Sequence, residues 1–240
     1  MEISPDKPTE IEICSASVFY GKERILENLS LSIKEQRVGF IGRNGSGKTT
    51  LLRILAGLQE LNNGKVLIDG TEVAKKRNEA IKKVGIIFQN PDHQIIFPTV
   101  GEELRFGLTQ LGLSKNEADL KVIACLKQYD KVDWFERSIS TLSQGQKHLV
   151  CLLSVLLMKP RVLLLDEPFT GIDIPTKLKL EQYLSSLKQT IIHVSHVPET
   201  FENYQRLIWI DKGIVQADGT PKRIIKKYRD AMDNYVEKNV

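Results

Sequence analysis

A short glycine-rich stretch at residues 42–50, Gly-Arg-Asn-Gly-Ser-Gly-Lys-Thr-Thr, has the residue types and spacing needed to hold a phosphate group. It fits the pattern of a glycine, four free positions and then Gly-Lys-Ser/Thr. Its glycines let the backbone turn tightly, so that several N–H groups converge on one anion. The stretch therefore predicts a nucleotide-binding loop, whose contributing residues are Gly42, Asn44, Gly45, Ser46, Gly47, Lys48, Thr49 and Thr50.

Two side chains of this loop have distinct expected roles. Lys48 supplies a compact positive charge beside the outer phosphates. The Thr49 hydroxyl can ligate Mg²⁺, and Thr49 also opens the following helix, whose N-terminal dipole favours the same anion. The sequence thus indicates ATP or a similar nucleotide, with Mg²⁺, as the ligand.

The segments on either side of the loop have the patterns of a strand and a helix. Residues 37–41 form a short apolar run, which predicts a buried strand. After the loop, apolar residues recur at helical spacing, namely Leu51, Leu52, Ile54, Leu55 and Leu58, with Gly57 near the stop. A phosphate-binding loop requires a strand before it and a helix after it. This context favours a phosphate-binding loop over a chance glycine-rich turn.

Two adjacent carboxylates follow a second apolar run. Asp166 comes directly after residues 162–165, so we expect it at the end of a buried strand, where a carboxylate needs a partner. Mg²⁺ held jointly with Thr49 is the expected partner. Glu167 would then orient, or accept a proton from, the water that attacks the γ-phosphate, with a purely structural role as the alternative.

Polar or aromatic side chains are also expected near the ends of other strands. Gln89 follows the apolar run 84–88, and His196 follows the run 190–194. Open α/β sheets place ligand contacts at the carboxyl ends of parallel strands, so His196 could hydrogen-bond the γ-phosphate, although a structural histidine is the alternative. Tyr20 precedes a predicted turn, where its ring would either stack on a nucleobase or be an ordinary core or surface aromatic.

A second anion site is predicted at residues 142–146, Leu-Ser-Gln-Gly-Gln, just before a helix over 145–158. A serine and a glycine at a helix N-terminus suit an anion. One nucleotide does not need two separate phosphate cradles, whereas two chains packed head to tail would use one cradle from each. The sequence therefore predicts an ATP-bridged dimer.

The remaining segments predict an α/β fold with a helical insertion. Strands are expected within residues 11–33, 65–68, 84–88, 162–166, 190–194, 206–210 and 213–217. Two capping-box spacings, Thr99 with Glu102 and Ser114 with Glu117, each predict the start of a helix between residues 90 and 158. Another helix is expected after Pro175, and the last twenty residues predict a short basic helix or tail.

Bulk composition narrows the class of protein. The 240 residues carry a net charge of +4, and the longest apolar run, residues 149–158, is about half the length that a membrane span needs. No signal sequence is expected at the N-terminus. The three cysteines are scattered without metal-ligand spacing, which predicts buried or indifferent thiols in a reducing compartment.

Together these motifs resemble the nucleotide-binding subunit of ATP-binding cassette (ABC) transporters over essentially the whole chain. Tyr20 resembles the base-stacking aromatic of that family, residues 42–49 its Walker A motif, and Gln89 its Q-loop. Residues 142–146 resemble its signature, 162–166 its Walker B motif, and 171–173 its D-loop, with Glu167 as catalytic base and His196 as the switch histidine. The resemblance implies ATP contacts from Ser143, Gly145, Gln146 and Asp173, and Gln89 as a further Mg²⁺ ligand beside Thr49 and Asp166.

The resemblance also implies the architecture. The expected fold is α/β, a P-loop NTPase core with a RecA-like, mostly parallel sheet, an antiparallel β-subdomain and a helical insertion. All 240 residues would form one nucleotide-binding domain. The core and β-subdomain are expected at about 1–90 and 160–220, the helical subdomain at about 90–159, and a short C-terminal tail at about 221–240.

A narrower resemblance lies in residues 88–100, which are similar to ATPases of energy-coupling factor importers for vitamins and metal ions. Within them the chain most resembles the biotin-importer branch, in residues 91–100 and in the variant signature Leu-Ser-Gln-Gly-Gln of residues 142–146. A cobalt, nickel or other vitamin importer is the alternative. The implied partners are a transmembrane coupling (T) subunit, a substrate-binding membrane (S) subunit, and a second copy or a paralogous ATPase, with no nucleic acid. The implied location is the cytoplasmic face of the cell membrane, as a peripheral subunit.

Two departures from the ABC pattern stand out. Gln144 occupies a position where the family usually has glycine, and His148 and Leu149 replace a more usual glutamine and arginine. Because of these departures, the sequence does not predict how the residues after the signature pack. Two other functions also remain open: a soluble cassette ATPase acting on ribosomes or DNA, which usually carries tandem cassettes or long coiled-coil insertions, and a non-hydrolysing regulatory module, which Glu167 and His196 argue against.

Overall fold

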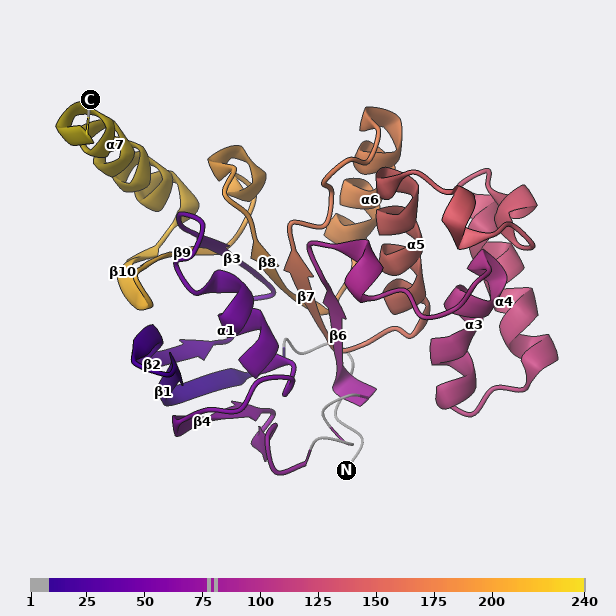
Figure 1. The fold of residues 1–240 in the computed structure, drawn as a ribbon, viewed down its shortest axis with the longest axis horizontal. Coiled ribbons are helices and arrows are strands. Elements are labelled where there is room, and N and C mark those ends of the chain that lie inside the picture. The colour runs from indigo at the N-terminus through magenta and orange to yellow at the C-terminus, as the bar shows by residue number, and fades with distance from the viewer. Residues whose placement is uncertain (1–8, 77–78, 80–81, 240) are drawn as a thin grey trace. The chain divides into compact units, whose positions relative to one another are not determined.

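The computed structural model describes residues 9–76, 79 and 82–239, and its ribbon is drawn in Figure 1. Strands come mostly in runs of three, and three helices, α3 to α5, follow one another in the middle of the chain. In chain order they are β1 (Ile11–Tyr20), β2 (Glu23–Ile33), β3 (Arg37–Ile41), α1 (Lys48–Leu55), β4 (Asn63–Ile68), β5 (Thr71–Glu72), β6 (Val84–Ile87), α3 (Val100–Gln110), α4 (Lys115–Gln128), α5 (Gln144–Leu157), β7 (Val162–Asp166), α6 (Ile174–Ser186), β8 (Thr190–Val194), β9 (Arg206–Asp211), β10 (Ile214–Gly219) and α7 (Pro221–Asn239).

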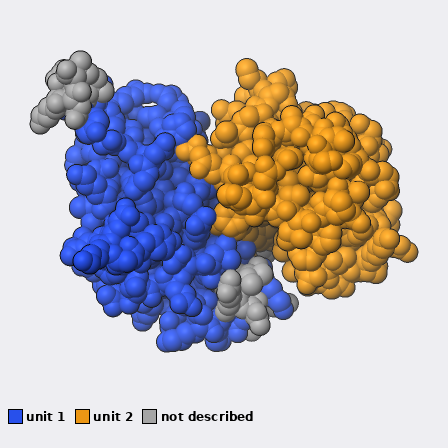
Figure 2. Space-filling model, in the orientation of Figure 1, with its two compact units in different colours: residues 1–84, 162–166, 188–240 blue, residues 85–161, 167–187 orange. Residues whose placement is uncertain are grey.

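The chain divides into two compact units, coloured separately in Figure 2. The first unit takes residues 1–84, 162–166 and 188–240, and the second takes residues 85–161 and 167–187. The glycine-rich loop and most of the strands lie in the first unit, and helices α3 to α6 lie in the second.

The first unit contains two sheets. One is antiparallel, with the strand order β2-β1-β4-β5. In the other, the strands of this unit have the order β10-β9-β3-β8-β7, and β3 pairs in parallel with both β8 and β9. Strands β7 and β8 are buried along their whole length, because a parallel strand in the middle of an α/β sheet is covered on both faces. This explains why the sequence shows them as continuous apolar runs.

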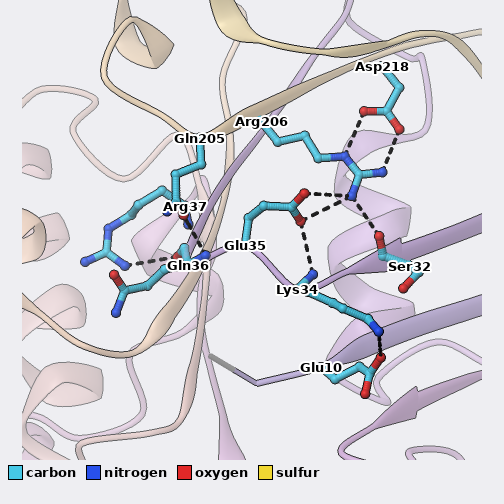
Figure 3. A network of polar contacts seen from close by, with 9 residues as sticks. All are labelled: Glu10, Ser32, Lys34, Glu35, Gln36, Arg37, Gln205, Arg206 and Asp218. Carbon is cyan, nitrogen blue, oxygen red and sulfur yellow. Dashed lines mark hydrogen bonds and ion pairs between the residues drawn. The ribbon is translucent and has the colours of Figure 1, made fainter. Parts of the chain in front are cut away.

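An arginine on β9 ties the strands of this unit together (Figure 3). The Arg206 guanidinium donates to both Asp218 carboxylate oxygens at 2.8 and 2.6 Å, to the Ser32 carbonyl at 2.7 Å, and to Glu35 at 3.3 and 3.2 Å. Its hydrogen bonds to Asp218 are the main reason that the pKa of Arg206 lies above its usual range. The paired fork joins β9 to β10 and to the end of β2, which fixes the antiparallel sheet beside the parallel one.

Side-chain hydrogen bonds cap the N-termini of helices α3 and α4 in the second unit. Ser114 and Glu117 form a reciprocal capping box at the start of α4. Thr99 accepts from the Glu102 backbone N–H, but its own hydroxyl donates to the Glu102 carboxylate at 2.7 Å. The expected capping box is therefore reciprocal at α4, whereas at α3 only the hydrogen bond from the Glu102 N–H to Thr99 is formed.

The last described segment is helix α7, one of the two forms that the sequence left open. Its apolar side chains Ile224, Ile225 and Tyr228 are buried against a cluster that includes Trp209 and Phe201. Its exposed residues are mostly charged, so the helix is amphipathic. Among the residues that the structure describes, no helix combines the length and apolar character that crossing a membrane requires.

The cysteines form no disulfide among the described residues. Burial raises the pKa of the Cys125 thiol to about 11 and that of the Cys151 thiol to about 12. These two thiols therefore stay protonated near neutral pH and are poor nucleophiles.

Candidate functional site

The glycine-rich loop connects β3 to α1, in the strand, loop and helix order that its sequence predicts. Gly45 and Gly47 have positive φ angles of 77° and 99°, a region that glycine adopts without strain. A Cβ on Gly42 would lie 2.0 Å from the carbonyl oxygen of Ile210, so only glycine fits there. The loop is therefore held against the end of β9 by a contact that excludes any side chain at Gly42.

Lys48 is the first residue of α1 and is 7% exposed. Its ammonium donates to the carbonyl oxygens of Gly42 at 2.7 Å and Arg43 at 2.8 Å. A lysine is seldom this buried unless its charge is paired or hydrogen-bonded, and these two carbonyls satisfy it. The charge of Lys48 is thereby held inside the curve of the loop.

Thr49 meets the first of the two predicted carboxylates. Its hydroxyl lies 2.7 Å from Oδ2 of Asp166, which is only 3% exposed. Asp166 ends β7 and is in register with Val194 at the end of β8, and Val194 is in register with Phe40 of β3. Three neighbouring parallel strands thus end together beside the loop, which is where α/β sheets place ligands. A hydroxyl and a carboxylate at this distance are hard oxygen donors suited to Mg²⁺.

The other residues predicted for this chemistry lie at, or one or two residues after, the end of a strand. Glu167 directly follows Asp166 and has a φ of 50°, in the left-handed region that non-glycine residues seldom occupy. His196 is exposed two residues after β8, and Gln89 is exposed two residues after β6. Tyr20 ends β1 and is 48% exposed, and its hydroxyl donates to the Gln59 side chain at 2.9 Å.

The second predicted cradle lies in the second unit, at the start of α5. Ser143 and Gln146 form a capping box: the Gln146 N–H donates to the Ser143 hydroxyl at 3.3 Å, and the Ser143 N–H donates to the Gln146 side chain at 3.0 Å. A Cβ on Gly145 would lie 1.7 Å from the carbonyl oxygen of Gly171. The start of α5 therefore touches the backbone of the predicted D-loop, which only a glycine permits.

Asp173 caps the helix that follows the D-loop. Its carboxylate accepts from the Thr176 backbone N–H at 3.0 Å at the start of α6, and the hydrogen bonds from Thr176 lower the pKa of Asp173. Asp173, Ser143, Gly145 and Gln146 all line one cavity of about 180 Å³. The structure thus brings the predicted residues of the second cradle to one place.

Lys131 and Trp134 also line this cavity, although no sequence pattern indicates them. Lys131 precedes and Trp134 ends a short 3₁₀ turn over Val132–Trp134 after α4, which is too short for periodicity or a motif to indicate. Arg43 is a third residue that the sequence did not single out. Its guanidinium lies 4.0 Å from the centre of the Tyr235 ring, so helix α7 contacts the glycine-rich loop.

The two unusual residues after the signature are both buried. His148 is 2% exposed, and its Nδ1 lies 2.7 Å from the Thr170 carbonyl oxygen, so α5 and the segment before the D-loop are hydrogen-bonded. Leu149 is 3% exposed and packs in the core where an arginine is more usual. Among the described residues the buried Nε2 of His148 has no hydrogen-bond partner, so the packing after the signature satisfies only one nitrogen of this ring.

Comparison with known proteins decides the family. The family model described as "ABC transporter" matches residues 26–170, which is more than half of the chain. The chain belongs to the ABC transporter family. It is an ATP-binding ATPase of that family, as its motifs predict, and the predicted fold class is confirmed as well. A solved structure described as an ATP binding subunit of an ABC transporter covers 95% of this chain with a TM-score of 0.82 and 25% identity.

Individual relatives of this ABC protein narrow the comparison. It is 42% identical to the "Biotin transport ATP-binding protein BioM" of Rhodobacter capsulatus, over 87% of this chain and 89% of the relative. It is 36% identical to the "Energy-coupling factor transporter ATP-binding protein EcfA" of Methanothermobacter thermautotrophicus, over 86% of this chain and 68% of the relative. The structure of cbiO1 from Clostridium perfringens, part of the complex cbiONQ, has a TM-score of 0.76 and 27% identity and covers 91% of both chains.

Proposed function

We propose that this ABC ATPase is the energy-coupling subunit of an energy-coupling factor importer, with biotin as the cargo. The observation that carries this proposal is the 42% identity to a biotin transport ATP-binding protein over 87% of the chain. The segment 91–100, Pro-Asp-His-Gln-Ile-Ile-Phe-Pro-Thr-Val, supports it as the stretch that most resembles the biotin branch. Another vitamin, cobalt or nickel is the alternative cargo.

In the proposed site, the loop 42–50 holds the phosphates of ATP and the Tyr20 ring stacks on the base. Thr49 and Asp166 would hold Mg²⁺, since their oxygen atoms lie 2.7 Å apart and the carboxylate is buried. Gln89 is the further proposed ligand. When bound, the ion neutralises charge on the β- and γ-phosphates.

Hydrolysis then follows the usual balance for phosphoryl transfer. The oxygen of a water forms a bond to the γ-phosphorus, the bond from that phosphorus to the bridging oxygen breaks, and ADP leaves with the electron pair. Glu167 takes the proton from the water, Lys48 stabilises the charge on the transferred group, and His196 donates a hydrogen bond to it.

The second cradle is proposed to bind the ATP held by another ATPase chain, either a second copy or a paralogue. Ser143, Gly145, Gln146 and Asp173 line one cavity, and Ser143 caps the first turn of α5, where backbone N–H groups favour an anion. ATP would thus close a dimer, and hydrolysis would reopen it. The proposed membrane partners are a coupling (T) subunit and a substrate-binding (S) subunit, reached through residues 90–106 at the cytoplasmic face.

The first test is to identify what accompanies the chain in its native host. The tagged chain is purified gently from detergent-solubilised membranes, and companion proteins and bound small molecules are identified by mass spectrometry. We expect two small membrane proteins and biotin. A different vitamin or a metal ion would replace the cargo alone, whereas only soluble partners, or co-purifying RNA, would contradict the transporter proposal.

A second test addresses the catalytic role of Glu167. We expect Glu167→Gln to bind ATP normally, to lose at least about a hundredfold in phosphate release, and to accumulate as a closed dimer, because the general base is absent. Phosphate release and analytical ultracentrifugation of the purified complex measure these effects. A variant that keeps its hydrolysis rate would remove Glu167 from the mechanism.

A further inference from the structure

The unusual Gln144 of the signature has a specific partner. Its side-chain nitrogen donates to Oδ2 of Asp92 at 3.0 Å. The Lys147 ammonium donates to the other carboxylate oxygen of Asp92, Oδ1, at 2.7 Å. Both oxygens of one carboxylate are therefore held by the first turn of α5, three residues apart on one face of the helix.

Asp92 belongs to the segment that follows Gln89, a short 3₁₀ turn over Pro91–His93. This segment lies along α5 beyond the carboxylate contact. The Gln94 side chain donates to the Cys151 carbonyl at 3.5 Å, and the Cys151 thiol approaches the Pro91 carbonyl at 3.9 Å. Residues 144, 147 and 151 recur at helical spacing, so the turn packs along one side of the first two turns of α5.

The charges at this contact are matched. The pKa of Asp92 is held below its usual range, mainly by hydrogen bonds from Lys147 and then Gln144, so the carboxylate is ionised at neutral pH. The Lys147 side chain is only 19% exposed, compared with 45% for Asp92. A negative charge beside the first turn of a helix is also favoured by the helix dipole. Glycine at position 144 could not make this contact, because it has no donor side chain.

We propose that Asp92 is a positioning residue for the second phosphate cradle, which it holds in place through Gln144 and Lys147. The inference rests on the proposed function, in which this cradle binds the ATP of another chain. The same turn opens the segment proposed to meet the membrane subunit, so a movement there would reach Ser143 and Gly145 through this contact. The hydrogen bonds of Asp92 to Gln144 and Lys147 lie within the second unit, whereas the glycine-rich loop belongs to the first.

The test compares two steps of ATP binding in full-length Glu167→Gln protein. Affinity for a fluorescent ATP analogue at low protein concentration reports the chain's own loop. Sedimentation with ATP at higher concentration reports dimer formation, which uses the second cradle. We expect Asp92→Ala to weaken the ATP-bridged dimer about tenfold while the analogue affinity stays within about twofold, because only the cradle loses its preorganisation.

Three further variants separate positioning from general stability. Asp92→Glu, which keeps the carboxylate, should restore most of the dimer, and so should the charge exchange Asp92→Lys with Lys147→Asp. Glu181→Ala is the matched control, because it removes a carboxylate from another ion pair of the same unit, at 3.6 Å from Lys177. We expect this control to dimerise like its parent.

The outcomes distinguish the inference from the proposal beneath it. A parent protein that stays monomeric with ATP, even with its membrane partners, contradicts the dimer mechanism and this inference with it. A parent that dimerises while Asp92→Ala dimerises equally well contradicts the inference alone. So does an Asp92→Ala protein whose analogue affinity and thermal unfolding midpoint fall together, since that is the result of a structural defect.

Discussion

At the scale of single residues, the contact between Gly145 and Gly171 gives the sharpest prediction. A Cβ at position 145 would lie 1.7 Å from a backbone oxygen, and backbone cannot move away as a side-chain end can. We expect Gly145→Ala to displace the start of α5 or the D-loop, to lower the free energy of unfolding by about 1–3 kcal/mol, and to weaken the proposed ATP-bridged dimer more than tenfold. Urea unfolding and sedimentation measure the two effects.

Gly112→Ala is the control for this substitution. Gly112 has a φ of 96°, but a Cβ there would meet nothing within 4 Å. The variant should therefore lose about 1 kcal/mol through backbone strain and keep its dimer. If Gly145→Ala also kept the dimer, the close contact with the D-loop would have no role in ATP bridging.

Sequence spacing places some residues of the candidate site together, but it does not identify their partners from distant parts of the chain. The loop glycines, Lys48 and Thr49 are indicated by spacing, because strand, loop and helix follow each other directly in the chain. Asp166 is indicated separately, by the apolar run that it ends. The partner of Gln144 could not be found this way. Asp92 lies fifty-two residues before it, and a departure from a family pattern carries no information about which distant side chain compensates for it.

At the scale of elements, helix α7 is more closely built into the core than a basic tail would be. Ile224, Ile225 and Tyr228 are buried against β9, where the rings of Tyr228 and Trp209 meet edge to face at 5.5 Å. The sequence of α7 shows charges more plainly than apolar residues, since only one narrow face is apolar. The local pattern therefore left helix and tail open, and the contact with β9 explains why the helix forms.

Removing α7 after Thr220 should destabilise the first unit. Burial of each large side chain contributes about 1.5–3 kcal/mol, and the entropy of the freed segment offsets part of the loss. We expect a net decrease of about 3 kcal/mol in the free energy of unfolding and a red shift of Trp209 emission, measured in a Trp134→Phe background. A chain ending after Met232 keeps the three buried side chains, so it should retain the free energy of unfolding and the Trp209 emission of the full chain. Unchanged emission in the chain that ends after Thr220 would show that α7 does not cover Trp209.

At the scale of the whole molecule, the order of the chain links its two units. The sequence passes between them at residues 84–85, 161–162, 166–167 and 187–188. Strand β7, which carries Asp166, belongs to the first unit. In the sequence, its five residues are preceded and followed by segments of the second unit. The first unit therefore cannot be completed from one continuous stretch of chain, and we expect the two units to unfold together.

Nucleotide binding tests this expectation, because a ligand stabilises only what unfolds with its site. ATP at about a hundred times its dissociation constant should add about 2.7 kcal/mol to the free energy of unfolding. Trp209 lies in the first unit and Trp134 in the second, so single-tryptophan variants report each unit separately. We expect ATP with Mg²⁺ to raise both denaturation midpoints equally, and EDTA to remove part of the gain. Lys48→Ala should abolish it in both, since the ammonium inside the loop is lost. A rise of the midpoint seen only through Trp209 would mean that the second unit unfolds on its own. ATP bound to the loop could then influence the signature only through a dimer, and not through the fold of a single chain.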